Sequence, residues 1–189
     1  KSADIGDSWE LYESDPIDTG TAEPSVIELK RGHILMIART KTGTLWISES
    51  MNNGKNWSTP KPSGIESYNT PASLLKHNSS LLTCYNSGSS RDKLCLSSTG
   101  SLSFNWDSTL DIDQIKNGSF PSINSIHPSG SDCAVTYPSM INYGKDKVMV
   151  VWSIGNTPAR APHSVVILAI DKRSSILNNC TPSPVNSST

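Results

Sequence analysis

The sequence predicts an all-β protein that forms part of a β-propeller, with about three four-stranded blades. One observation is the composition, which is rich in Ser, Thr and Asn and contains 12 Gly and 12 Pro, with 17% charged and 35% hydrophobic residues. Such a composition favours turns and short strands over helices. The other observation is a strand-turn-strand unit that recurs three times along the 189 residues.

The repeated unit starts at an anchor proline, which is Pro24, Pro71 or Pro138. A short apolar strand follows each proline, then a polar turn, and then two further apolar strands. The second strands lie at 34–38, 81–85 and 148–152, and the third strands at 45–48, 94–97 and 165–168. Continuous apolar runs of this length are typical of strands buried on both faces. Four-stranded units repeated at about 45 to 50 residues indicate propeller blades.

A turn signature accompanies the blades. Residues 50–57 read S-x-N-x-G-x-x-W, residues 2–9 read S-x-D-x-G-x-x-W, and residues 98–106 are a degenerate version. This spacing predicts a tight hairpin in which the Asp or Asn accepts backbone hydrogen bonds and the Gly takes a positive φ. The Ser helps to close the loop, and the Trp packs beneath it. We interpret these boxes as folding elements and not as binding sites.

The repeats divide the chain into consecutive segments. Residues 1–10 are expected to end a preceding blade, and blades are expected over 11–62, 63–110 and 132–176, with an inserted rim loop over 111–131 and a C-terminal tail over 177–189. A closed propeller typically has about four to eight blades. We therefore expect the chain to be a fragment of a larger propeller, or one chain of a cut protein.

The charges exclude two classes of partner. Lys and Arg number 16, Asp and Glu number 17, and the net charge is -1, which gives no electrostatic sign of a nucleic-acid binder or of a polybasic membrane anchor. No run approaches the about 18 apolar residues of a transmembrane helix. The histidines fall in predicted loops and turns and form no metal or general-base cluster; they are His33, His77, His127 and His163.

The cysteines and the glycosylation sequons favour a secreted or cell-surface protein. Four cysteines permit two disulfides, and their spacing does not match a zinc site; they are Cys84, Cys95, Cys133 and Cys180. Cys84 and Cys95 lie in adjacent predicted strands of one hairpin and are candidates for a disulfide, although in a cytosolic protein they would be reduced core residues. Sequons for N-glycosylation begin at Asn56, Asn78, Asn117, Asn179 and Asn186.

Candidate functional residues come from comparing equivalent positions, because radially arranged blades present these to one central point. The position just before the anchor proline holds Glu23, Thr70 and Tyr137 in the three repeats. The position fifteen residues after the proline, at the end of the second strand, holds Arg39, Asn86 and Ser153. Arg91 follows Asn86 in the next loop. We therefore expect Glu23, Arg39, Arg91 and Tyr137 to line one mouth of the central channel, where charged and phenolic groups suit a ligand better than a hydrophobic core.

These residues resemble the active-site segments of the sialidase (neuraminidase) superfamily, whose propellers carry BNR, or Asp-box, repeats. The segment from Glu23 to Arg39 is similar to the one that supplies a catalytic Glu and one arginine of the family's arginine triad. The segment with Arg91 resembles the one that carries the last arginine of the triad, and the segment with Tyr137 resembles the one that carries the nucleophilic tyrosine. The match covers about residues 1–155 and implies the C-terminal half of a six-bladed catalytic domain.

The resemblance implies an exo-α-sialidase that needs no cofactor and hydrolyses terminal sialic acid from glycoconjugates with retention of configuration. In that chemistry Arg39 and Arg91 would bind the sialic acid carboxylate by charge-assisted hydrogen bonds. A carboxylate nucleophile would meet a repulsion of ~4 kcal/mol at ~4 Å and an effective dielectric constant near 20. The neutral phenol of Tyr137 avoids this repulsion and would use Glu23 as its base.

Part of the family's site is missing from this sequence. The first triad arginine and the acid/base aspartate of the family lie in N-terminal blades, so the 189 residues alone are not expected to be a competent enzyme. Those blades are therefore expected partners. The alternatives are a catalytically inactive, lectin-like propeller that binds glycans, and a structural platform for other proteins; transfer of the sialyl group in place of hydrolysis would use the same residues. Only an enzyme needs both Glu23 and Tyr137.

Overall fold

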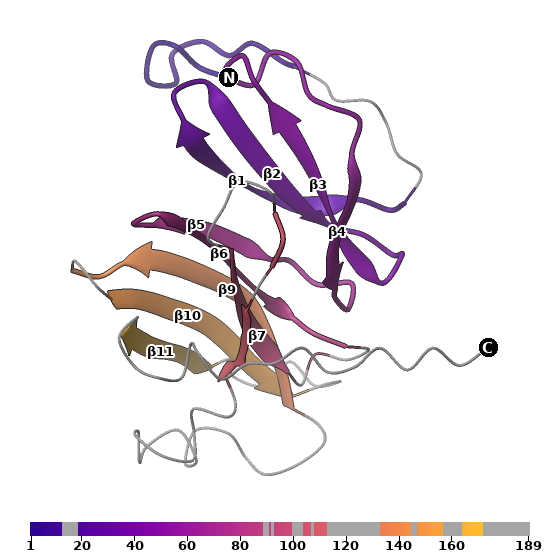
Figure 1. Ribbon diagram of the computed structural model, residues 1–189, viewed down its shortest axis with the longest axis vertical. Coiled ribbons are helices and arrows are strands. Elements are labelled where there is room, and N and C mark those ends of the chain that lie inside the picture. The colour runs from indigo at the N-terminus through magenta and orange to yellow at the C-terminus, as the bar shows by residue number, and fades with distance from the viewer. Residues whose placement is uncertain are drawn as a thin grey trace.

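The described part of the chain forms three antiparallel β-sheets (Figure 1). The computed structural model describes residues 1–12, 19–88, 91, 93–99, 104–106, 108–112, 133–144, 147–156 and 164–171. The first sheet contains β1 (Ala22–Lys30), β2 (His33–Arg39), β3 (Thr44–Ser50) and β4 (Lys61–Glu66). The second contains β5 (Ser73–His77), β6 (Ser80–Asn86), β7 (Leu94–Thr99) and β8 (Ser108–Asp111). The third contains β9 (Cys133–Asn142), β10 (Lys147–Asn156) and β11 (Ser164–Asp171).

The sheets are arranged as successive blades of a propeller. Within each sheet the strands pair in chain order, so each sheet is a simple meander. The first strands of neighbouring sheets contact one another, β1 with β5 and β5 with β9, whereas the later strands lead away from this common line (Figure 1). The predicted all-β, partial-propeller fold is therefore confirmed. The described part of the chain contains no helix long and apolar enough to cross a membrane.

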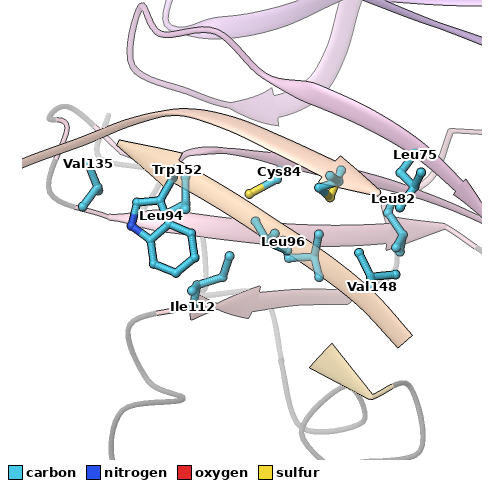
Figure 2. Close-up of a cluster of buried hydrophobic side chains, with 11 residues drawn as sticks. Leu75, Leu82, Cys84, Leu94, Leu96, Ile112, Val135, Val148 and Trp152 are labelled. Atoms are coloured by element: carbon cyan, nitrogen blue, oxygen red, sulfur yellow. The ribbon is translucent and has the colours of Figure 1, made fainter. Parts of the chain in front are cut away.

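Two hydrophobic cores hold the sheets together. The core between the first and second sheets includes Leu35, Ile37 and Leu74. The core between the second and third sheets includes Leu82, Val150 and Trp152 (Figure 2). Each of these side chains is at most 7% exposed. Because successive residues of a strand point to opposite faces, the apolar run of β6 supplies both cores, as its continuous pattern predicted.

The outer faces of the first and third sheets are less buried. On the first sheet Val26 of β1 pairs with Met36 of β2, and Val26 is 57% exposed. On the third sheet Ile141 of β9 pairs with Met149 of β10, and Ile141 is 54% exposed. The continuous apolar runs predicted burial on both faces, and among the three sheets described only the second one has it.

The two intact boxes form the same hydrogen-bonded turn. In the first, Gly6 N donates to Ser2 Oγ at 2.7 Å, Ser8 N donates to Asp4 Oδ1 at 2.9 Å, and Trp9 Nε1 donates to Gly6 O at 3.1 Å. The second box repeats each bond within 0.2 Å, with donors from Gly54, Asn56 and Trp57 and acceptors on Ser50, Asn52 and Gly54. Both glycines have a positive φ, 103° and 81°. The predicted roles of the Ser, the Asp or Asn and the Gly are confirmed, whereas Trp9 is 74% exposed and is not packed beneath its turn.

The predicted Cys84–Cys95 disulfide is wrong, because both residues are thiols in this structure. In the pairing of β6 with β7, Cys84 lies opposite Leu96 and Cys95 lies opposite Tyr85. The two cysteines are therefore one residue out of register and point to opposite faces of the sheet, into different cores. Burial raises the pKa of the Cys84 thiol, which keeps it protonated and unreactive.

Two histidines differ from the sequence-based expectation that they fall in loops. His33 and His77 lie within β2 and β5 and are 5% and 3% exposed. His33 Nε2 lies 2.8 Å from Glu49 Oε2, and His77 Nδ1 lies 2.7 Å from Asn142 Oδ1. They are buried because a neighbouring strand offers each ring a polar partner. His127 and His163 lie outside the described residues.

The boxes provide a test of the turn hydrogen bonds. Ser50 is 1% exposed, whereas Ser2 of the first box is half-buried and its hydrogen bonds are exposed to solvent. Ser50→Ala is expected to lower the free energy of unfolding by about 1–3 kcal/mol, since it leaves buried groups without a partner. Ser2→Ala is the matched control and should cost less, because water replaces the lost bonds. Urea denaturation of both variants measures the difference, and equal losses would contradict this reasoning.

The first box also predicts a pH effect. Hydrogen bonds from the hydroxyl and backbone N–H of Ser8, and then from Ser2, lower the pKa of Asp4 from 3.8 to about 2. A carboxyl whose pKa is lower in the folded state stabilises the fold above its unfolded pKa, and this stabilisation is lost as the pH falls through about 2. Ser8→Ala should therefore raise the pKa of Asp4 toward 3.8 in an NMR titration of its carboxyl carbon. An unchanged titration would disprove the assigned cause.

Candidate functional site

Glu23 and Tyr137 occupy the same unusual position in two different sheets. In β1 the pairs Ala22↔Arg39 and Ser25↔Ile37 leave Glu23 and its proline opposite one residue of β2. In β9 the pairs Thr136↔Ser153 and Ser139↔Val151 leave Tyr137 and its proline opposite one residue of β10. Each site is thus a β-bulge, which bends the strand and changes the direction of a side chain.

Both bulged residues have a left-handed backbone. The φ angle is 49° at Glu23 and 55° at Tyr137, which costs a residue with a side chain roughly 1–2 kcal/mol. Each stands before a proline, which favours an extended conformation for its predecessor. Strained backbone of this kind is concentrated at functional sites, where the surrounding structure enforces it. Among the described strands, Glu23 and Tyr137 are thus the two residues that combine a positive φ with a bulge before a proline.

The third equivalent residue serves as an internal comparison. Thr70 also precedes an anchor proline, but it does not appear among the residues with a positive φ. It lies before the start of β5, its hydroxyl donates to Tyr68 O at 3.1 Å, and it is fully buried. Tyr137 is 54% exposed and the Glu23 side chain is 35% exposed. The bulge therefore accompanies the two positions that present a titratable group to solvent.

Arg39 is held in place from two sides. Its Nε lies 2.8 Å from Glu23 Oε2, although the two atoms are out of line for a hydrogen bond. Its Nη1 donates to Asn69 O at 3.1 Å and to Asn69 Oδ1 at 3.2 Å. The side chain is 22% exposed, and no partner is recorded for Nη2 within the described residues. That nitrogen provides two N–H donors for an anion.

Asn69 is a site residue that the sequence comparison missed. It lies in the loop between β4 and β5, and it orients the guanidinium of a residue thirty positions earlier in the chain. The loop is fixed by Tyr68 O, which accepts hydrogen bonds from the hydroxyls of Ser67 and Thr70. No spacing rule connects Asn69 to Arg39, because their contact crosses between two blades.

Arg91 is placed by its backbone beside the strand of Tyr137. Its carbonyl accepts a 2.7 Å hydrogen bond from Val135 N. The side chain of Asn86 donates to Val135 O at 2.8 Å and to Lys93 O at 3.0 Å. Two hydrogen bonds thus join the end of β6 and its loop to the start of β9, and the bond from Asn86 to Lys93 O holds that loop together. Arg91 and Tyr137 lie on the two segments that these bonds connect.

The structure does not bring all of the predicted site residues into contact. Among the described residues no hydrogen bond connects the Glu23 carboxylate to the Tyr137 phenol, and Glu23 pairs with Arg39 instead. No group of three or more His, Cys, Asp or Glu in that part of the chain is placed to hold a metal ion. Asn56 and Asn78 are exposed. The sequons at Asn117, Asn179 and Asn186, nearly all of the rim loop and the C-terminal tail lie outside the described residues.

A comparison of sequence families identifies the repeat. The family described as "BNR repeat-like domain" matches residues 1–150. The chain belongs to this BNR repeat-like family. Among curated protein sequences, none matches the chain.

Solved structures resemble this BNR repeat-like chain in fold. The NanB sialidase from Streptococcus pneumoniae matches with a TM-score of 0.67 and 20% identity, over 95% of this chain and 27% of that one. The leech intramolecular trans-sialidase matches with a TM-score of 0.69 and 17% identity, over 93% and 27%. The intramolecular trans-sialidase from Ruminococcus gnavus matches with a TM-score of 0.67 and 15% identity, over 97% and 38%. The chain therefore has the fold of sialidase propellers and spans 27% to 38% of their length.

The bulge at Tyr137 predicts an unusual order of stabilities. Glycine normally makes a strand less stable than alanine does, by about 0.5–1 kcal/mol, but it removes the strain at a positive φ. We expect Tyr137→Gly to be more stable than Tyr137→Ala by about 1 kcal/mol in urea denaturation. At Ser139, an exposed residue of the same strand, the order should be the normal one. Finding alanine the more stable residue at both positions would refute the strain.

Proposed function

We propose that this chain is part of an exo-α-sialidase that removes terminal sialic acid from glycoconjugates with retention of configuration. The observation that carries the proposal is the pair of matching bulges at Glu23 and Tyr137, together with Arg39 held next to Glu23. A carboxylate, a phenol and a guanidinium group are the groups that this reaction requires. The sialidases and trans-sialidases of similar fold support the substrate class.

Arg39 is the proposed anchor for the carboxylate of the sugar. Two of its nitrogens, Nε and Nη1, are held by Glu23 and Asn69, which leaves Nη2 as the proposed donor to the sugar. A guanidinium held in one orientation loses little conformational entropy when it binds a carboxylate. Each hydrogen bond to a charged group contributes roughly 1.5–3 kcal/mol. Arg91 would provide a second cation from the neighbouring blade.

Binding of the carboxylate would also prepare the base. In the ligand-free structure the Glu23 carboxylate is attracted to Arg39 over 2.8 Å. An incoming carboxylate shares that positive charge and weakens the ion pair, which releases Glu23 to accept the proton of the Tyr137 phenol. The phenol oxygen then bonds to the anomeric carbon while the bond to the leaving oxygen breaks. Water displaces the tyrosine in a second step, and two displacements give retention.

The leaving oxygen needs a proton from an acid, which we propose is supplied by further blades of the ring. Val26 and Ile141, on the outer faces of the first and third sheets, are apolar and more than half exposed, as expected for side chains that neighbouring blades cover. A secreted or cell-surface location agrees with this proposal, because sialylated glycoconjugates are found there. Whether water or another sugar accepts the sialyl group decides between hydrolysis and transfer.

One observation favours a second candidate, a lectin-like module without catalysis. Glu23 forms its ion pair with Arg39 and no hydrogen bond with Tyr137 among the described residues, an arrangement that orients a carboxylate-binding arginine without activating a nucleophile. Such a module would bind sialosides with Arg39 and leave them intact. Replacement of Tyr137 separates the two candidates, since only the enzyme depends on the phenol.

The phenol oxygen is tested by its removal. In the full protein, with the further blades of the ring, Tyr137→Phe is expected to lower the release of free sialic acid by about 100-fold or more, because the nucleophile is lost while the ring is kept. Tyr143→Phe is the matched control, since Tyr143 is 52% exposed and follows the other end of β9, and it should stay within about twofold of wild type. Colorimetric measurement of free sialic acid from sialyllactose gives both values.

The outcomes separate the candidates. A folded wild-type protein that releases no sialic acid but binds sialyllactose would replace the enzyme by the lectin-like module. A wild type that neither cleaves nor binds it would end both candidates. If Tyr137→Phe keeps full activity, the enzyme uses another nucleophile.

A further inference from the structure

Asn86 is a buried amide that joins the segments of two proposed site residues. It ends β6, at the position equivalent to Arg39 of the first sheet, and it is 0% exposed. Its Nδ2 donates to Lys93 O at 3.0 Å and to Val135 O at 2.8 Å. Both partners are carbonyl oxygens, so only the amide NH2 group of the side chain can bond to them.

Each carbonyl stands two positions from a proposed site residue. Lys93 follows Arg91 in the loop after β6, and Val135 precedes Tyr137 in β9. The backbone adds a third bond, from Val135 N to Arg91 O at 2.7 Å. Val135 is 1% exposed and lies at one end of the hydrophobic core between the second and third sheets (Figure 2). The joint is therefore buried and anchored by packing as well as by hydrogen bonds.

The backbone of Asn86 is held by the loop between β4 and β5. Ser67 lies in that loop, its Oγ donates to the backbone Asn86 O at 2.9 Å, and it is 1% exposed. The same loop carries Asn69, which holds Arg39. One set of hydrogen bonds thus connects the entry loop of the second blade, the loop of Arg91 and the strand of Tyr137. These segments come from three different parts of the chain.

We propose that Asn86 is a positioning residue, which fixes the Tyr137 phenol relative to Arg91 for the reaction, and this inference rests on the proposed function. Loss of its side chain leaves two carbonyl groups without this donor in a buried joint. Asn86 holds Val135, which stands two residues before the bulge at Tyr137. A shift of the strand start therefore moves the phenol, and a displacement of about 1 Å at a reacting group is able to cost about 100-fold in rate.

The molecule offers a matched control at the opposite end of β9. Asn142 also joins the second and third sheets by two side-chain hydrogen bonds, from its Nδ2 to Lys76 O at 3.1 Å and between its Oδ1 and His77 Nδ1 at 2.7 Å. It is five residues beyond Tyr137, and the two side-chain bonds described for it reach β5 and not the loop of Arg91. A variant at Asn142 loosens the same pair of blades without disturbing the proposed site.

The first test is kinetic and uses sialyllactose as substrate. In the full protein, Asn86→Ala is expected to lower kcat/KM by between tenfold and about 100-fold, mainly through kcat. Asn142→Ala should stay within about twofold of wild type, with both variants measured well below their unfolding temperatures. If the two variants lose the same activity, Asn86 is only a structural residue and the inference fails.

The second test does not depend on activity and so separates this inference from the proposed function. NMR spectra with 13C-labelled tyrosine and 15N-labelled arginine should show shifted or broadened signals of the Tyr137 ring and the Arg91 guanidinium in Asn86→Ala, and unchanged ones in Asn142→Ala. Unchanged signals in both would overturn the positioning role even in an active enzyme. If Asn86→Ala does not fold, Ser67→Ala removes the bond that supports Asn86 and should produce a smaller effect on the same two signals.

Discussion

Burial of both faces of the second sheet is the constraint on which the arrangement of the blades depends. In β6 alternate residues enter different cores, with Leu82 and Cys84 packed against the third sheet and Leu81 and Tyr85 against the first. Each fully buried apolar side chain contributes roughly 1.5–3 kcal/mol, whereas an exposed ion pair contributes about 0–1 kcal/mol. Packing therefore decides the angle between the blades, and this angle brings the first strands, which carry the proposed site, next to one another.

The strained backbone at the proposed site lowers the stability that this packing provides. Two bulges hold Glu23 and Tyr137 at a positive φ, at a cost of roughly 1–3 kcal/mol each. The cost is offset close by, because Ala38 and Trp152, which lie opposite the two bulges, are each 3% exposed and the latter belongs to a core. Thr70, at the third equivalent position, has no strained backbone and no access to solvent. Of the three equivalent positions, the two with a strained backbone are therefore the two whose side chains reach solvent.

The last residue of the second strand makes a different contact at each of the two interfaces between neighbouring sheets. At the end of the second strand, Arg39 reaches Asn69 across the first joint and Asn86 reaches Val135 across the second. Both side chains donate to a backbone carbonyl shortly before the next anchor proline. The Arg39 side chain is partly exposed, as its proposed binding role requires. Asn86 is completely buried. The same repeated contact therefore holds the residue proposed for binding in one joint and the residue proposed for positioning in the other.

The sequence by itself determined the blades, the turn chemistry of the boxes and the choice of Glu23, Arg39 and Tyr137, because these depend on local periodicity and on a repeat that places equivalent residues alike. Only the tertiary structure decided that Cys84 and Cys95 do not face each other, since a difference of one residue in register sends them to opposite sides of a sheet. It also decided that Glu23 pairs with Arg39, and that Asn69 and Asn86 support the site. These contacts join residues 16 to 49 positions apart, and no local pattern encodes them, because they form only when the packing of the cores has set one blade against the next.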